Sequence, residues 1–391
     1  LFGNARSSPP FEQALFNAIG DILPNVPPPT TVTTTATLNN GDLGGPFIIF
    51  DRHFQTPLVQ SWNLGVQQEV FPSVTVEVNY VGQHATHLFR DVDGNPPQPA
   101  KIAALIAAGR NPASLQGQAL RFSLSTVNNT ALFEPLVQES VASGIYHGLQ
   151  LGVTKRFSHG LQIQGSYTYS HAIDNGSDPI DPTAGNRGLP RNSFNLGPER
   201  GNSDFDIRHR AVINYIYELP VGKGKAHVSG GAMGRVLEGW QVSGIMIFSG
   251  GLPYDIFGNR DDQHTGLSDR VNLIGDPSNH PPGTDKTHTG PARSSFQLAA
   301  FGTVPNLTRN KFFGPGQNNF DVVLQKTTSF TERFKLVLRF ESYNLFNRVY
   351  FGQPGNLFQN AGTFGVSSTQ VGRPDGTSGA RQLQVAAKIH F

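Results

Sequence analysis

Hydrophobic and polar residues alternate along the last twelve positions of the chain, Ala380 to Phe391. Successive side chains of a β-strand point to opposite faces, so this pattern predicts a strand with one apolar face. The two parities separate cleanly, with Gln382, Gln384, Lys388 and His390 on the polar side and Leu383, Val385, Ala387, Ile389 and Phe391 on the apolar side.

The same alternation recurs upstream and predicts nine strands in total. Ile245 and Ile247 interrupt the polar parity of the sixth, so its register is the least determined by the pattern. The predicted strands upstream of the last one cover residues 59–70, 74–80, 149–157, 161–169, 211–219, 239–256, 320–330 and 334–346.

The connections between these strands alternate between short and long. Turns are expected at 71–73, 158–160 and 331–333, with a medium connection at 220–238. Residues 1–57 are rich in Pro, Thr, Asn and Gly, and read as a loop region with one possible helix at 11–23. A second helix is expected at 101–108. The long loops between strands are expected at about 91–143, 174–203, 257–318 and 349–379.

This spacing favours a membrane barrel over a soluble β-sandwich. Outer-membrane barrels have short periplasmic turns and long extracellular loops, whereas several loops of about thirty residues are uncommon in compact domains. We therefore predict an all-β fold: the C-terminal part of a transmembrane antiparallel outer-membrane β-barrel, at 58–391, with about nine or ten strands. Residues 1–57 would be an extracellular loop region, and Phe391 would end in the periplasm.

Single-chain bacterial barrels have an even number of strands, so a count of nine predicts that this chain is a fragment. Its lipid-facing strands make outer-membrane lipid the expected surroundings. The formal charge of +2, with only 15% charged residues, gives no electrostatic footprint for nucleic acid. The absence of cysteine removes disulfides and thiolate metal sites, and no apolar run reaches the length of a transmembrane helix.

Several short motifs occur in an order that resembles the barrel region of TonB-dependent outer-membrane receptors, specifically the Oar-like group. That resemblance implies a 22-stranded barrel that imports a scarce solute with energy delivered through TonB. The plug domain and TonB box of such receptors are not in this sequence, and would lie upstream in a full-length protein. The motifs lie at 56–64, 67–69, 78–82, 87–88, 148–151, 155–157, 166–174, 206–210, 239–241, 249–253 and 339–347, and the chain ends on Phe391.

Three groups of residues are predicted to carry function. Leu383, Val385, Ile389 and Phe391 form the expected signal for the barrel assembly machinery. Lys335, Arg339 and Glu341 share the polar parity of one strand and could line a solute path or contact the plug. Asp206, Arg208 and Arg210 are charge-dense at a strand start, where they could touch ligand or plug, or pair with one another at the extracellular rim.

Two lysines, Lys155 and Lys326, fall on the apolar parity of their strands. A charge that faces lipid at mid-membrane costs about 2–4 kcal/mol. Lys155 lies near a turn, to which its ammonium could snorkel, whereas the pattern offers no account of Lys326.

The sequence predicts no catalytic residue, metal site or cofactor. Aspartates at 174–181 and 259–269 could supply oxygen ligands for Ca²⁺, but they lack the twelve-residue EF-hand spacing. His264, His280 and His288 lie in one loop without zinc spacing, and His84 and His87, near a strand end, are interpreted as interface or loop residues. Hydrolase and phosphate-loop motifs are missing. Solute uptake is therefore the leading hypothesis. A surface barrel for adhesion and an outer-membrane barrel enzyme are the alternatives.

Overall fold

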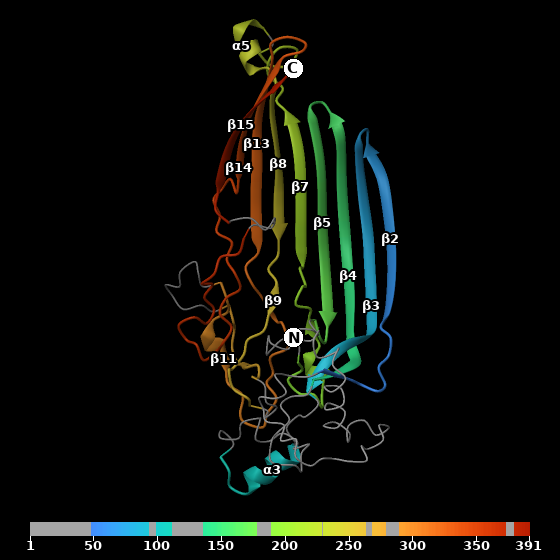
Figure 1. The fold of residues 1–391 in the computed structure, drawn as a ribbon, viewed down its shortest axis with the longest axis vertical. Helices are drawn as coiled ribbons and strands as arrows, with labels where there is room; N and C mark the ends of the chain where they lie inside the picture. Colours follow the sequence, from blue (N-terminus) through green and yellow to red (C-terminus); the bar gives the residue numbers. More distant parts are fainter. Residues whose placement is uncertain are drawn as a thin grey trace, which may run out of the picture. The chain divides into compact units, whose positions relative to one another are not determined.

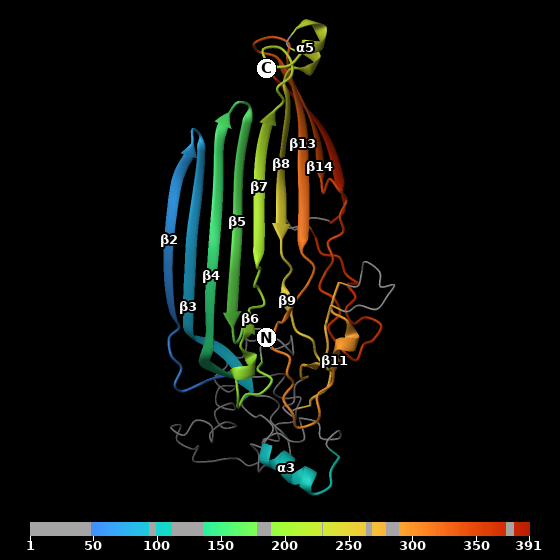
Figure 2. The same ribbon diagram turned by 180° about the vertical axis from the view of Figure 1, so that it is seen from behind.

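Nine long strands form one antiparallel sheet in which strands adjacent in the sequence are mostly adjacent in space (Figures 1 and 2). The computed structural model describes residues 48–93, 99–111, 136–177, 189–228, 230–262, 268–278, 289–372 and 379–391. Every predicted strand is present, which confirms the all-β antiparallel expectation. The strands are β2 (Leu58–Phe71), β3 (Val74–Asp93), β4 (Leu136–Ser158), β5 (Leu161–Asp174), β7 (His209–Glu218), β8 (Trp240–Ser249), β13 (Gln317–Ser329), β14 (Lys335–Tyr343) and β15 (Gln382–His390).

The sheet is open, with β2 and β15 as its two edges. Short elements fill the connections. β1 (Ile48–Phe50) runs parallel to β4, and β6 (Gly201–Asn202) pairs with β5. Separate ladders join β9 (Pro253–Tyr254) to β12 (Phe312–Phe313) and β10 (Asn272–Leu273) to β11 (Phe296–Gln297).

The helices are short. The helix expected at 101–108 is confirmed as α3 (Pro99–Ala107), whereas α5 (Gly231–Leu237) was not predicted, because glycines at 230, 231 and 234 disfavour a helix there. Two 3-10 turns, η2 (Gly197–Glu199) and η3 (Arg293–Ser295), lie in the connections. No helix among the described residues is long and apolar enough to cross a membrane. The helix expected at 11–23 lies outside the described residues.

Cross-strand registers give the sheet two continuous faces. On the first, which we call the apolar face, Val385 pairs with Phe340, and Leu324 lies between Phe340 and Val242. Met246 of β8 lies beside Ile213 and Phe320, so the uncertain sixth strand follows its neighbours. The opposite surface, which we call the polar face, carries Gln241, Gln325, Arg339 and Gln384.

Several strand limits differ from the prediction. β3 and β4 remain paired as far as Asp93 and Leu136, so the expected loop at 91–143 is shorter. The end of β3 was not predicted, because the charged residues Arg90, Asp91 and Asp93 interrupt the alternating pattern. All three are nevertheless buried. β8 ends at Ser249 rather than near residue 256, and β14 ends at Tyr343, before Asn344 with φ 52°.

The two lysines on the apolar face lie near strand ends, where their ammonium groups reach backbone carbonyls. Nζ of Lys155 donates to the carbonyls of Ser158 and Leu161, both at 3.0 Å, and to Oγ of Ser158 at 2.7 Å. The snorkelling predicted for Lys155 is therefore confirmed. Nζ of Lys326 donates to the carbonyl of Glu238 and lies 5.9 Å from the ring centroid of Trp240.

The connections at the other end of the sheet have a hydrophobic core of their own. Ile256 and Val271 are fully buried there, and Phe296 stacks edge-on against Phe364 at 5.7 Å between ring centroids. These residues come from separate loops, so the loops pack on one another as a folded layer. The cluster comprises Tyr254, Ile256, Val271, Phe296, Leu307 and Phe364.

Candidate functional site

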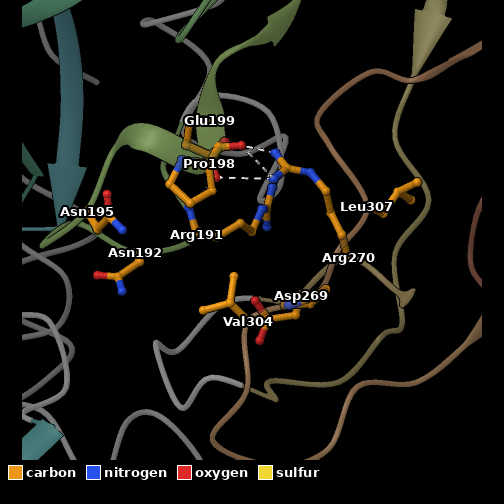
Figure 3. A pocket seen from close by; sticks show the side chains of 10 residues that line it. Arg191, Asn192, Asn195, Pro198, Glu199, Asp269, Arg270, Val304 and Leu307 are labelled. Carbon is orange, nitrogen blue, oxygen red and sulfur yellow. Dashed lines mark hydrogen bonds and ion pairs between the residues drawn. The ribbon is translucent and has the colours of Figure 1, made fainter. Parts of the chain in front are cut away.

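A buried ion-pair network lies among these connections, centred on the carboxylate of Glu199 (Figure 3). Nη2 of Arg270 donates to Oε2 of Glu199 at 2.9 Å, and Nε of the same guanidinium donates to Oδ2 of Asp255 at 3.1 Å. Nη2 of Arg90, near the end of β3, lies 3.9 Å from Oε2 of Glu199. All four side chains are buried.

A second group of charges surrounds Arg309. Its Nη1 donates to Oδ1 of Asp174 at the end of β5, and its Nη2 donates to Oδ1 of Asp204 at 3.1 Å. The next residue, Asn310, donates its backbone N–H to Oδ1 of Asp255 at 2.6 Å. The two groups therefore form one network that ties the strand ends to the loop layer.

Electrostatics in this network favour the charged forms. Burial acts to raise the pKa of the Glu199 carboxyl, but the positive charges of Arg270, Arg191 and Arg90 outweigh it and lower the pKa to about 2. Burial acts to lower the pKa of the Arg270 guanidinium, yet Asp255 and Glu199 together raise it above its usual range. Each charge thus stabilises the ionised form of its neighbour.

The network has a structural role rather than a solute-binding one. Its guanidiniums and carboxylates pair with one another: Arg90 and Arg270 with Glu199, Arg270 with Asp255, and Arg309 with Asp174 and Asp204. The cavity lined by Arg191, Glu199 and Arg270 measures only about 30 Å³, which is room for water and not for a solute. We conclude that it holds the loops in place.

A much larger cavity, of about 680 Å³, lies on the polar face of β3, β4 and β5. Pockets for small molecules commonly fall in this range. Amide and hydroxyl side chains of the strands line this cavity, together with apolar side chains from the strands and the adjoining loop. The lining includes Gln83, Tyr146, Gln150, Thr168, Ser170 and Arg210, and the apolar Leu88, Phe89 and Phe205.

Of the three charged residues predicted at 206–210, Asp206 and Arg210 line this cavity. Oδ2 of Asp206 accepts from Nε of Arg208 at 2.7 Å, and Oδ1 accepts from the backbone N–H of Ala172 at 2.8 Å. The Arg208 guanidinium also lies 5.6 Å from the ring centroid of Phe313. Arg210 is exposed beside Thr168 and makes no ion pair with any described residue.

The polar face of β14 brings two of its three predicted residues together. Nη2 of Arg339 lies 2.9 Å from Oε1 of Glu341, whose Oε2 accepts a hydrogen bond from the Tyr343 hydroxyl at 2.9 Å. Lys335 is exposed at the start of β14, in register with Ser329 and His390. Lys335 is therefore at one end of β14, whereas Arg339 and Glu341 lie further along the strand.

The predicted assembly residues share the exposed apolar face of β15. Leu383, Val385 and Ile389 are exposed, and Phe391 follows the strand with 92% of its surface accessible. β15 pairs on one side only, with β14. A partner that recognises these side chains would meet no steric barrier from the described residues.

Two of the aspartates considered as calcium ligands are engaged by arginines. Asp174 pairs with Arg309, and Asp262 pairs with Arg260. Within the described ranges, no three acidic or histidine side chains are grouped closely enough to hold a metal ion. Asp178, Asp181, His264, His280 and His288 lie outside those ranges.

The ion-pair network escaped prediction from the sequence because its partners are far apart in the chain. Glu199 and Arg270 are 71 residues apart, and Asp174 and Arg309 are 135 apart. No local spacing connects them. The only hint is Asp174 itself, which the sequence pattern groups with a possible cation site.

Several solved outer membrane proteins are similar to this chain. The outer membrane transporter YddB from Escherichia coli shares 10% identity with a TM-score of 0.43, over 89% of this chain and 34% of that one. The pyoverdine outer membrane receptor FpvA from Pseudomonas aeruginosa PAO1 shares 11% identity with a TM-score of 0.40, over 86% and 30%. The FrpB iron transporter from Neisseria meningitidis shares 11% with a TM-score of 0.38, over 88% and 32%.

The chain thus spans about a third of the length of these structures. No match was found among curated proteins. A family model described as an outer membrane beta barrel domain matches residues 2–384. The chain therefore belongs to the outer membrane β-barrel domain family and resides in the bacterial outer membrane.

Proposed function

We propose that this chain is the C-terminal part of the barrel of a TonB-dependent outer membrane receptor, of the Oar-like type, that takes up a scarce solute. The ordered motifs between residues 56 and 391 support this family. The two unpaired edges, β2 and β15, support a barrel with more strands than these nine. In this proposal the apolar face contacts lipid and the polar face lines the lumen. Residues 1–57 and the long connections lie outside the cell.

The cavity of about 680 Å³ is the observation that carries the proposal. Small closed barrels of about eight strands fill their interior with side chains, whereas wider barrels leave room for a channel or a plug. Here the polar face is hollowed beside the folded loop layer, where a solute arriving from outside would first meet the lumen. Arg210 supplies a positive charge without an ion-pair partner among the described residues.

The remaining predicted residues receive roles that fit this arrangement. The Arg339–Glu341 pair and Lys335 would contact the plug of the full-length protein, and energy would come from TonB in the periplasm. Leu383, Val385, Ile389 and Phe391 would be read by the barrel assembly machinery during insertion. Their exposure on one face of an edge strand supports that last role.

Uptake by cells carrying the full-length gene tests the proposal. A strain from which the gene is deleted, and the same strain complemented, would be grown under limitation of iron, cobalamin or carbohydrate, with and without a proton uncoupler. We expect one limitation to give a growth defect on deletion, and the corresponding labelled solute to accumulate only without uncoupler. In that assay Arg210→Gln should reduce uptake, while the matched change Lys225→Gln, at the opposite end of the sheet, should not.

Two results would contradict this function. Equal growth of both strains under every limitation, together with weaker attachment of the deletion strain to surfaces, would instead identify an adhesion barrel. Accumulation that persists with the uncoupler would identify a passive pore. Heat-modifiable electrophoretic mobility of the variants would show that each barrel is folded.

A further inference from the structure

The connection between β7 and β8 differs from the others at its end of the sheet. The other connections there are the turns at 72–73, 159–160 and 330–334, whereas residues 219–239 form a loop and α5. Figure 1 shows α5 beyond the strand ends, at the same end as the C-terminus. Short connections mark the periplasmic side of outer-membrane barrels, so α5 belongs to the periplasmic rim.

One side of α5 is apolar and unburied. Met233 and Val236 are 62% and 61% exposed, and with the half-buried Leu237 they follow the i, i+3, i+4 spacing of a helix face. Gly234 is buried on another side, where its carbonyl accepts from the backbone N–H of Lys223 at 3.2 Å. The helix therefore rests on its own loop and leaves the side chains of Met233 and Val236 mostly exposed.

The C-terminal end of α5 is attached to the lipid-facing side of the sheet. Trp240 and Lys326 pair across β8 and β13 on the apolar face. Nε1 of Trp240 donates to the carbonyl of Val236 at 3.2 Å, and Nζ of Lys326 donates to the carbonyl of Glu238. Because both donors face lipid, the helix end that they hold lies at the margin of the lipid-covered surface.

The charges around α5 suit a phospholipid surface. Lys223 and Arg235 are exposed and make no ion pair with any described residue, whereas Lys225 is paired with Glu218 at 2.8 Å. Amphipathic helices with apolar residues on one face and basic residues on the other lie in the interfacial region of membranes. Tryptophan is enriched at the membrane–water interface, so the position of Trp240 is consistent with that same depth.

We propose that α5 is an interfacial anchor that inserts Met233 and Val236 into the phospholipid leaflet at the periplasmic rim of the barrel. Lys223 contacts lipid phosphates, and Trp240 and Lys326 fix the helix at the correct depth. The anchored surface is continuous with the lipid-facing side of the sheet. It does not depend on which solute, if any, the barrel transports.

Depth-dependent quenching in bilayers tests the anchor. The chain contains no cysteine, so a single introduced cysteine reports from one position. The full-length barrel would carry Met233→Cys or Val236→Cys, labelled with an environment-sensitive fluorophore, in phosphatidylethanolamine and phosphatidylglycerol bilayers with a quencher on the upper acyl chain. Arg235→Cys, on the other side of the same helix, is the matched control, and Leu151→Cys on β4 is a lipid-exposed reference.

We expect the labels at 233 and 236 to be quenched at least about twofold more strongly than the label at 235. Equal, weak quenching at all three positions, with full access to a water-soluble quencher, would overturn the anchor. Protection from both quenchers would also overturn it, and would identify a periplasmic protein as the occupant. Strong quenching of the label at 151 would show that each barrel is inserted.

Discussion

The guanidinium of Arg270 and the carboxylate of Glu199 form an ion pair at 2.9 Å, with only 4% and 3% of the two residues exposed. Burying two charges costs several kcal/mol for each, and their attraction offsets this only when the remaining hydrogen bonds are also made. Here Asp255 completes the bonds of Arg270, and the backbone N–H of Arg191 donates to Glu199 at 3.2 Å. The loop layer is therefore stable only in the arrangement that satisfies all of these groups.

Replacing Arg270 by Met should destabilise the loop layer strongly. The change leaves Glu199 and Asp255 buried without their closest cation, which costs about 3–5 kcal/mol for a buried pair. Urea titration of the folded barrel, followed by proteolysis within residues 250–316, would measure the loss. Lys225→Met is the matched control, because it breaks the exposed pair with Glu218 and should cost about 0–1 kcal/mol. Equal losses would show that the buried network does not stabilise the loops.

Acid should loosen the same loops over a defined range. The pKa of Glu199 is lowered from 4.5 to about 2 in the folded protein. A carboxyl with a depressed pKa contributes its full stability above the unfolded value and loses it as the pH falls towards the folded value. The hydrogen-exchange protection factors of residues 189–200, which correct for the intrinsic pH dependence of amide exchange, should therefore be constant above about pH 5 and fall below it. Glu199→Gln should exchange faster at neutral pH, with a much weaker acid dependence, and an unchanged acid dependence would rule out Glu199 as its source.

The strands were predictable because one physical constraint acts along the whole sheet. A barrel strand must place alternate residues against lipid, so Leu383, Val385 and Ile389 already define the faces of β15 without knowledge of its neighbours. The same constraint placed Met246 correctly despite Ile245 and Ile247, since the polar face tolerates apolar side chains more readily than the lipid face tolerates charges. Local alternation of apolar and polar residues is therefore sufficient to predict most of the strands and their faces.

The loop layer and the network were not predictable in the same way. Arg309 reaches Asp174 across 135 residues, and Phe296 meets Phe364 from a different loop. Such contacts depend on how separate loops fold over one another, which no spacing encodes. Arg90 and Asp91 misled the prediction further, because buried and paired charges look like loop residues when their partners are unknown. The cavity beside Arg210 likewise arises only from the assembled strands.

The two faces of β14 predict opposite effects of arginine at adjacent positions. Leu338 lies between Lys326 and Ala387 on the apolar face, whereas Val337 lies between Thr327 and Lys388 on the polar face. Leu338→Arg exposes a charge to lipid and should cost up to about 2–4 kcal/mol, less if the position is near the interface. Val337→Arg should be close to neutral. Urea unfolding and the yield of heat-modifiable barrel would measure both, and equal damage would contradict the assignment of the faces.

Glycine should be required at 239 by two independent constraints. Gly239 has φ 75°, and a Cβ there would lie 2.2 Å from the backbone oxygen of Thr327. The same contact includes a hydrogen bond from the Thr327 N–H to the Gly239 carbonyl, at 2.9 Å, so the backbone cannot retreat without losing it. Gly224 has a similar φ of 77°, but a Cβ at that position would have no atom within 4 Å.

Comparing the two alanine variants separates backbone conformation from steric contact. Gly224→Ala should cost about 1–2 kcal/mol for the left-handed conformation alone. Gly239→Ala bears the same cost and must also displace β13 from β8, so it should destabilise the barrel by at least about 2 kcal/mol more in urea unfolding. Because Gly239 also ends the connection that carries α5, its variant should weaken lipid quenching at position 236. Equal stability of the two variants would mean that β13 can shift near Thr327 without cost. In that case the close packing of β8 against β13 would not be what holds α5 in place.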